Sequence, residues 1–225
     1  MSLTGNPSSL RQALQFPSGF VREIFSLIID IWANIVFPPG ANAEVPMTNF
    51  LHETLIDAYE HRGLPWFISL EQPVVDRATG QAPGRTDIRF LHRQLPGQKT
   101  FFVVETKRLN ITSGKGKQIN SNAAAYVNDG MIRFINGQYS QHLPSGAMIG
   151  YVMNSQTSVA RSKVNAKIAQ ESAILRCDGQ PTITACVEQF PANMGGQTQH
   201  NRLSEHGGKF IMYHLFLAVE ARHFN

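Results

Sequence analysis

One apolar run that leads straight into charged residues constrains the fold of this chain more than any other feature. Residues 101–104 are Phe-Phe-Val-Val, and Glu105, Thr106 and Lys107 follow at once. Consecutive apolar residues favour a strand that is covered on both faces, as in the centre of an α/β sheet. The charged side chains then lie at the tip of a buried strand, where they are costly unless they are paired or bind a metal ion.

The segments around this strand predict a three-stranded meander. Residues 66–75 are rich in β-forming side chains, and residues 86–91 alternate between polar and apolar. A loop rich in Gly and Pro separates them at 76–85, and residues 95–98 form a turn before the strand at 100–107. We therefore expect the second and third strands to be antiparallel neighbours, with the third one buried.

Helices and further strands flank the meander. Apolar spacings of three and four predict a buried helix at 20–37, which we prefer to a signal peptide because Asp30 interrupts its apolar stretch. A second helix is expected at 47–62, with Thr48 or Asn49 as its N-cap. Beyond the meander we expect, in order, a helix at 118–135, a strand at 147–153, a helix at 159–176 and a strand at 209–219.

This order of elements predicts an α/β fold with a mixed sheet flanked by helices. We expect residues 1–46 to form an arm and a helix that pack on the core, and residues 47–225 to form the functional domain. A length of 225 residues, 42% of them hydrophobic, allows a substantial core.

Composition narrows the class of protein without naming an activity. The formal net charge of +4 permits an anionic partner such as nucleic acid. The chain contains no apolar run of the length that spans a membrane, so we expect no membrane association. Cys177 and Cys186 do not form a Cys-x-x-Cys pair and fit a reducing compartment, which predicts a cytoplasmic protein.

Two acids and a lysine form the most informative group of residues. Asp87 lies on the second strand of the meander, and Glu105 and Lys107 lie on the third. Residues two apart in a strand share a face, and a hairpin between the strands brings the two carboxylates together. Paired carboxylates suit Mg²⁺, and a lysine beside them can orient a water molecule and neutralise charge on a phosphoryl group.

A partly exposed ion pair is the alternative interpretation of Glu105 and Lys107, since such pairs are common on strand faces and contribute little. Two further observations favour a metal site. The sequence Gly-Arg-Thr-Asp-Ile at 84–88 lies one hairpin earlier, and the strand that leads into Glu105 is hydrophobic.

The segments at 84–88 (GRTDI) and 101–109 (FFVVETKRL) together resemble the PD-(D/E)xK nuclease superfamily, which has the restriction-endonuclease-like fold. The resemblance implies that Asp87 and Glu105 bind Mg²⁺, or Mn²⁺ as an alternative, and that Lys107 assists the attacking water. The carbonyl of Thr106 is then a further metal ligand.

The resemblance also predicts a further acid and a biological role. An acid on the helix before the meander often completes such sites, and Glu53 is our candidate, with Glu71 on the first strand as a weaker one. The similarity extends more loosely over residues 47–219 to restriction-like proteins of bacterial defence systems. It predicts an endonuclease that hydrolyses DNA, with RNA or branched DNA as other substrates, and a homodimer.

Basic residues near the strand tip are candidates for contacts with DNA phosphates. Lys115 and Lys117 lie in a Gly-rich loop that lacks the spacing of a nucleotide-binding P-loop, and Arg108 adjoins the acids. Arg133 is expected to pair with Asp129 one helical turn earlier. The alternative to an enzyme is an inactive nuclease-fold module that binds nucleic acid or scaffolds a defence complex.

Overall fold

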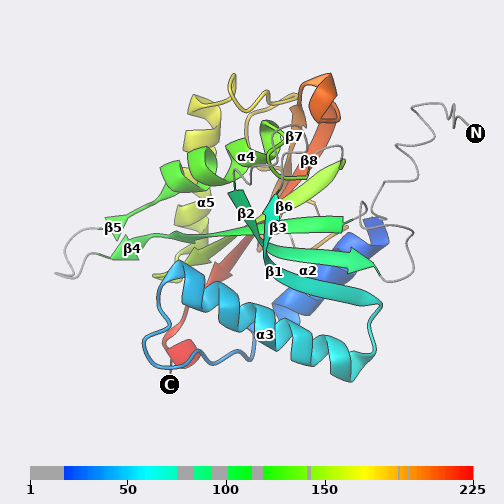
Figure 1. Cartoon of the computed structure of the whole chain (residues 1–225). Helices are drawn as coiled ribbons and strands as arrows, with labels where there is room; N and C mark the ends of the chain where they lie inside the picture. The colour runs from blue at the N-terminus through cyan, green and yellow to red at the C-terminus, as the bar shows by residue number, and fades with distance from the viewer. Residues whose placement is uncertain are drawn as a thin grey trace, which may run out of the picture.

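The computed structural model describes residues 18–74, 84–92, 101–112, 119–140, 143–186, 188–191 and 193–224, and a single six-stranded sheet runs through them (Figure 1). The strands lie in the order β1-β2-β3-β6-β8-β7. Their bounds are β1 Trp66–Val74, β2 Gly84–His92, β3 Phe101–Leu109, β6 Ser145–Val152, β8 Lys209–Ala218 and β7 Gly195–Asn201.

The sheet is mixed, as expected. The predicted meander is present, because β1, β2 and β3 pair antiparallel in sequence order. β3, β6 and β8 are parallel to one another, and β7 closes the far edge antiparallel to β8. β3 therefore lies inside the sheet, and six consecutive residues from 102 to 107 are buried.

Helices cover both faces of the sheet (Figure 1). One face packs against α2 and α3, and the other against a helix with a π-helical first part and against α5. The bounds are α2 Ser18–Trp32, α3 Glu44–Arg62, π segment η1 Ala125–Met131, α4 Ile132–Ile135 and α5 Thr157–Gln170. The smaller elements are β4 Ile111–Thr112, β5 Ile119–Asn120 and the 3-10 turns η2 Ser204–His206 and η3 Ala221–Phe224.

The alternation of β3 divides its side chains between two hydrophobic clusters. Phe102 and Val104 pack with α2 and α3, whereas Val103 and Leu109 pack beneath the π segment and α5. α2 contributes a continuous apolar stripe to the first cluster, which confirms a buried helix there, although the helix ends at Trp32 and not at residue 37 as predicted. None of the described helices is long and apolar enough to cross a membrane.

Helix α3 starts earlier than predicted, and this shift matters for the site. Its first residue is Glu44, so Thr48 and Asn49 lie inside the helix and the predicted N-cap is wrong. Pro46 lies in the first turn of the helix, where proline is tolerated because its missing N–H would have no helical acceptor. The Thr48 hydroxyl instead donates to the Glu44 carbonyl oxygen at 2.9 Å.

The other differences lie after the meander. The helix predicted at 118–135 begins at residue 123, because residues 119–120 pair with 111–112 as a small hairpin. Strand β7 was not predicted, since its sequence GGQTQHN has no apolar alternation. Its glycines permit close packing at the sheet edge: a Cβ on Gly195 would lie 2.0 Å from the His214 carbonyl oxygen.

Candidate active site

The site forms where β2 separates from β3. Among the described residues the pairing of these strands ends at Ile88 and Val104, which leaves the next part of the β3 edge without a strand partner. The Asp87 carboxylate takes that place. Its Oδ2 accepts hydrogen bonds from the Thr106 backbone N–H and from the Thr106 hydroxyl, both at 2.7 Å. The strand geometry thus fixes one oxygen of Asp87 directly on β3.

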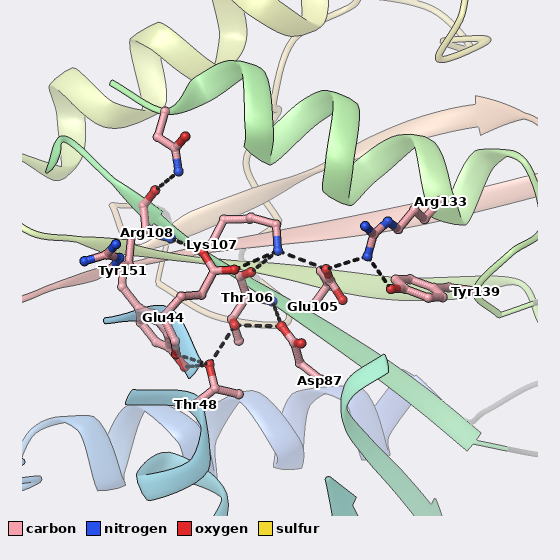
Figure 2. Close-up of polar contacts among 11 residues, drawn as sticks. Glu44, Thr48, Asp87, Glu105, Thr106, Lys107, Arg108, Arg133, Tyr139 and Tyr151 are labelled. Carbon is pink, nitrogen blue, oxygen red and sulfur yellow. Dashed lines mark hydrogen bonds and ion pairs between the residues drawn. The ribbon is translucent and has the colours of Figure 1, made fainter. Parts of the chain in front are cut away.

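Lys107 lies at the centre of the charged group (Figure 2). Its ammonium donates to Glu105 Oε1 at 3.0 Å, to Glu44 Oε1 at 3.0 Å and to the Thr106 carbonyl at 2.8 Å. These three acceptors use all three N–H donors of a lysine. The structure therefore brings Asp87, Glu105 and Lys107 together, as the sequence pattern predicted.

Glu44 is the acid that α3 contributes, in place of the predicted Glu53. Glu44 Oε2 also accepts from the Arg108 backbone N–H at 3.0 Å, so the first turn of the helix is tied to β3. Glu53 has a side chain that is 70% exposed and contacts His52. Nine residues separate the two acids, or about 13 Å along a helix. The side chain of Glu71 lies outside the described residues.

Arg133 completes the group on the other side of Glu105, and sequence analysis did not predict this. Its Nη1 lies 3.7 Å from Glu105 Oε1 and donates to the Tyr139 hydroxyl at 2.7 Å. Figure 2 shows the resulting row of alternating charge, Glu44, Lys107, Glu105 and Arg133, with Asp87 beside it. We call these five residues the charged row.

Burial makes the carboxylates of the charged row unusual. Glu105 is 1% exposed, and burial together with the neighbouring Asp87 raises its pKa to about 8. Burial also raises the pKa of Asp87, although Lys107 and the Thr106 hydrogen bonds oppose this. For Lys107, burial lowers the pKa, but the surrounding carboxylates outweigh it and the net shift is upward. Lys107 is thus held as a cation.

One atom in the charged row is left without a partner. Glu105 Oε2 is buried and accepts no hydrogen bond from the described residues. A buried carboxylate oxygen without a donor is costly, and the row contains three acids against only two basic side chains. An additional cation at Glu105 would pair this oxygen and favour the ionised form of a carboxyl whose pKa burial raises.

The other predicted site residues have varied positions. The Thr106 carbonyl, predicted as a metal ligand, accepts from Lys107, and the Arg108 guanidinium donates to the Asn42 carbonyl at 2.8 Å. Lys115 and Lys117 lie outside the described residues. A pocket opens beside Asp87 and is lined by Glu44, Val45, Thr48, Asn49, Leu70, Asp87 and Thr106.

The arrangement is suited to a cation that needs few protein ligands. In the described ranges no group of three or more His, Cys, Asp and Glu side chains is arranged to hold a metal ion. The Lys107 ammonium lies between Glu44 and Glu105, so these two acids do not converge on one point. Mg²⁺ is nevertheless commonly bound by one or two carboxylates, with waters and substrate phosphates as its other ligands.

No protein-family model matches the chain, and neither a curated protein nor a solved structure does. The chemistry of the side chains in the charged row is therefore the basis for assigning a function.

Proposed function

We propose that this protein is a metal-dependent nuclease that hydrolyses DNA phosphodiester bonds, with a restriction-endonuclease-like core. The observation that carries the proposal is the meeting of Asp87, Glu105 and Lys107 at the point where β2 and β3 separate. The mixed sheet flanked by helices supports the fold part of this proposal, in agreement with the resemblance of the GRTDI and FFVVETKRL segments to PD-(D/E)xK nucleases.

The residues present fit Mg²⁺. Asp87 and Glu105 would hold the ion, and the orphaned Glu105 Oε2 is the observation that supports this assignment. The Thr106 carbonyl oxygen is close to both acids and would be a further metal ligand. When bound, the ion supplies positive charge to the phosphate and makes a coordinated water more acidic.

Lys107 has two roles in this proposal. With its ammonium held at the strand tip by Glu44, the N–H that now points to Glu105 would turn to a water molecule at the phosphorus, and the ammonium charge neutralises charge that develops on the phosphoryl oxygens. Glu44 keeps the ammonium in place when Glu105 binds the cation. Phosphodiester hydrolysis needs alignment and charge stabilisation more than covalent catalysis, and this small set can supply both.

DNA is the substrate that we favour, and anti-phage defence or restriction is the proposed biological setting. The net charge of +4 is compatible with a polyanion. Bound Mg²⁺ would convert the excess negative charge of the charged row into an excess positive one, which suits an anionic phosphodiester. A homodimer, which would cut both strands of a duplex, belongs to the same proposal.

A cleavage assay tests the proposal. Purified protein is incubated with plasmid DNA, single-stranded DNA, branched DNA and RNA, each with Mg²⁺, Mn²⁺ or EDTA. We expect metal-dependent cleavage by the wild type and none by Lys107→Ala. Lys209→Ala is the matched control. Lys209 pairs with Asp178 at 3.4 Å, and its side chain is 86% exposed at the N-terminal end of β8.

Two outcomes would count against the proposal. If the wild type leaves every nucleic acid intact with both metal ions, it is not a nuclease, and a gel-shift measurement then tests the alternative of an inactive nucleic-acid-binding module. If Lys107→Ala cuts as fast as the wild type, the activity belongs to another site or to a contaminant.

A further inference from the structure

The surroundings of Arg133 differ from those of an arginine that only supports the fold. Arg202 is a structural arginine: it is 4% exposed, and its guanidinium donates to the carbonyls of Phe134, Ser140 and Leu143. The Arg133 side chain is 37% exposed, although it reaches a carboxylate that is almost fully buried. Arg133 therefore lies where solvent meets the charged row.

Most of the donors of Arg133 are unused. A guanidinium carries five N–H donors, and in the described part of the chain only Nη1 of Arg133 has partners, Tyr139 and Glu105. The contact with Glu105 is long, at 3.7 Å, and the acid already accepts from Lys107 at 3.0 Å. The remaining donors at Nε and Nη2 are available to a ligand of the charged row.

Tyr139 fixes the orientation of this guanidinium. The Tyr139 ring is fully buried, its hydroxyl accepts from Nη1 at 2.7 Å, and the guanidinium carbon lies 5.6 Å from the ring centre. A side chain anchored at one nitrogen loses less entropy when its other nitrogens bind an anion. The π segment before Arg133 provides the close helix–sheet packing, because Gly130 allows its backbone to approach Met148.

We propose that Arg133 binds the phosphodiester group that is to be cleaved, through the guanidinium donors that Tyr139 and Glu105 leave unused. This inference rests on the proposed nuclease function and identifies the substrate contact. Guanidinium groups match two phosphate oxygens at once, and Arg133 and Lys107 both contact Glu105 Oε1, so the phosphate would lie between two cations. Arg133 is then a substrate-binding residue, not only a partner of Glu105.

Binding of a fluorescein-labelled DNA duplex, followed by anisotropy from 50 to 200 mM salt, tests this inference independently of cleavage. Ca²⁺ replaces Mg²⁺ in one series and EDTA is present in a second. We expect Arg133→Ala to bind about tenfold more weakly and to lower the salt-dependence slope by about one, the signature of one lost phosphate contact. Arg133→Lys keeps the charge and should recover the slope but only part of the affinity.

Arg62→Ala is the matched control. Arg62 also pairs with one carboxylate, Asp30 at 3.1 Å, and its side chain is 48% exposed, but it lies at the opposite end of α3 from Glu44. We expect this variant to keep the wild-type slope and affinity. Tyr139→Phe removes the anchor but not the charge, so it should weaken binding and leave the slope unchanged.

The outcomes separate this inference from the proposed function. If the wild type cleaves DNA but Arg133→Ala keeps its affinity, slope and KM, Arg133 does not bind the phosphate and the inference is wrong. If the wild type does not cleave DNA, the proposed function is wrong, whereas a slope that falls by about one in Arg133→Ala still supports a phosphate contact. Should Arg133→Ala fail to fold, Arg133→Lys and Tyr139→Phe answer the same question.

Discussion

The sheet contains two buried polar side chains, Glu105 and His214, whose surroundings differ in almost every respect. Glu105 on β3 pairs with Met148 on β6, and Met148 pairs with His214 on β8. Two strand spacings, about 10 Å, therefore separate the backbones of Glu105 and His214. Glu105 belongs to the charged row and has one oxygen without a partner, whereas His214 is fully buried and both of its ring nitrogens are bonded.

The network around His214 is neutral and complete, and its proton positions follow from one carbonyl. The Leu175 carbonyl can only accept, so His200 Nδ1 carries the proton at 2.7 Å and His200 Nε2 must accept from Thr198. Thr198 in turn accepts from His214 Nε2 at 2.9 Å, which leaves His214 Nδ1 to accept from Tyr126 at 3.0 Å. We call these residues the histidine chain.

The difference shows how a buried polar group reveals its role. In the histidine chain every donor meets an acceptor and no charge is present, which is the arrangement that burial tolerates best. The charged row lies in the same sheet but has an unpaired oxygen and more acids than bases. A cation from outside the chain would satisfy both. Variants of the charged row should thus cost activity, and variants of the histidine chain should cost stability.

The largest expected effect is on catalysis. Glu105→Gln should lower the rate of DNA cleavage by about 10³-fold, because it replaces a proposed metal ligand by a neutral amide that binds a cation poorly. It should leave the free energy of unfolding nearly unchanged, since a carboxyl whose pKa is raised to about 8 and the amide that replaces it differ little in charge near neutral pH. Cleavage kinetics and urea denaturation measure the two effects. A variant that is destabilised by more than about 2 kcal/mol but still cuts at the wild-type rate would contradict the comparison.

The next effect is on stability. Thr198→Val leaves the His214 N–H and the acceptor nitrogen of His200 without partners inside the protein, which should cost about 2–4 kcal/mol of unfolding free energy. The rate of cleavage per folded molecule should not change. Thr184→Val is the control, because Thr184 is exposed at the edge strand and its loss should cost at most about 0.5 kcal/mol. Equal effects of the two substitutions would show that the histidine chain contributes no stability.

The contrast also explains what could be predicted from the sequence. Asp87, Glu105 and Lys107 were predictable because strand periodicity and hairpin pairing place them together. Glu44 was not, because the helix was predicted to begin at residue 47 with Thr48 or Asn49 as its N-cap, whereas it begins at Glu44. Glu53 lies on the same helix, about 13 Å further along, and its exposed side chain contacts His52.

The place of Arg133 in the charged row was not predicted, for a different reason. Its predicted pairing with Asp129 assumes α-helical spacing, in which residues four apart stack on one face. Residues 125–131 form a π segment with wider turns, and the Arg133 guanidinium contacts Glu105 and Tyr139, whereas Asp129 only adds to the rise of the Arg133 pKa. No feature of the sequence alone indicates a π segment here. Strand β7 could not be predicted from the sequence either, since its polar residues carry no alternating apolar pattern.

Acid should distinguish the two regions through the titration of His200. Burial lowers the pKa of His200 to about 4, and nearby Arg202 acts in the same direction while the Leu175 carbonyl opposes it. Between pH 6.5 and 4 the unfolded chain binds this proton and the folded chain does not, so His200 lowers stability as the pH falls, by up to about 3 kcal/mol. Burial also lowers the pKa of His214, which adds to the same trend. Glu105 in the charged row acts in the opposite direction, because its raised pKa makes the folded chain bind a proton that the unfolded chain releases between pH 8 and 4.5.

Urea denaturation at several pH values measures this loss. His200→Gln lowers stability at every pH because it disrupts the histidine chain, but it should flatten the slope between pH 6.5 and 4. The slope of the unfolding free energy against pH is the informative quantity, because it depends on the difference in bound protons between the folded and unfolded chains and not on lost contacts. A wild-type slope in His200→Gln would mean that other groups cause the acid sensitivity.

The smallest effect compares two bridging threonines directly. Thr48 corresponds in the charged row to Thr198 in the histidine chain: its hydroxyl lies 2.8 Å from that of Thr106, which holds Asp87 Oδ2. Thr48→Val should loosen Asp87 and weaken Mg²⁺ binding about tenfold, as expected for a residue that orients a metal ligand, while stability changes by only about 1 kcal/mol. Calorimetric titration with Mg²⁺ measures the affinity, and Thr48→Ser should restore it. If Thr48→Val instead destabilises the fold as strongly as Thr198→Val without changing Mg²⁺ affinity, the hydroxyls around Asp87 serve packing, and the division between a functional row and a structural chain fails at this residue.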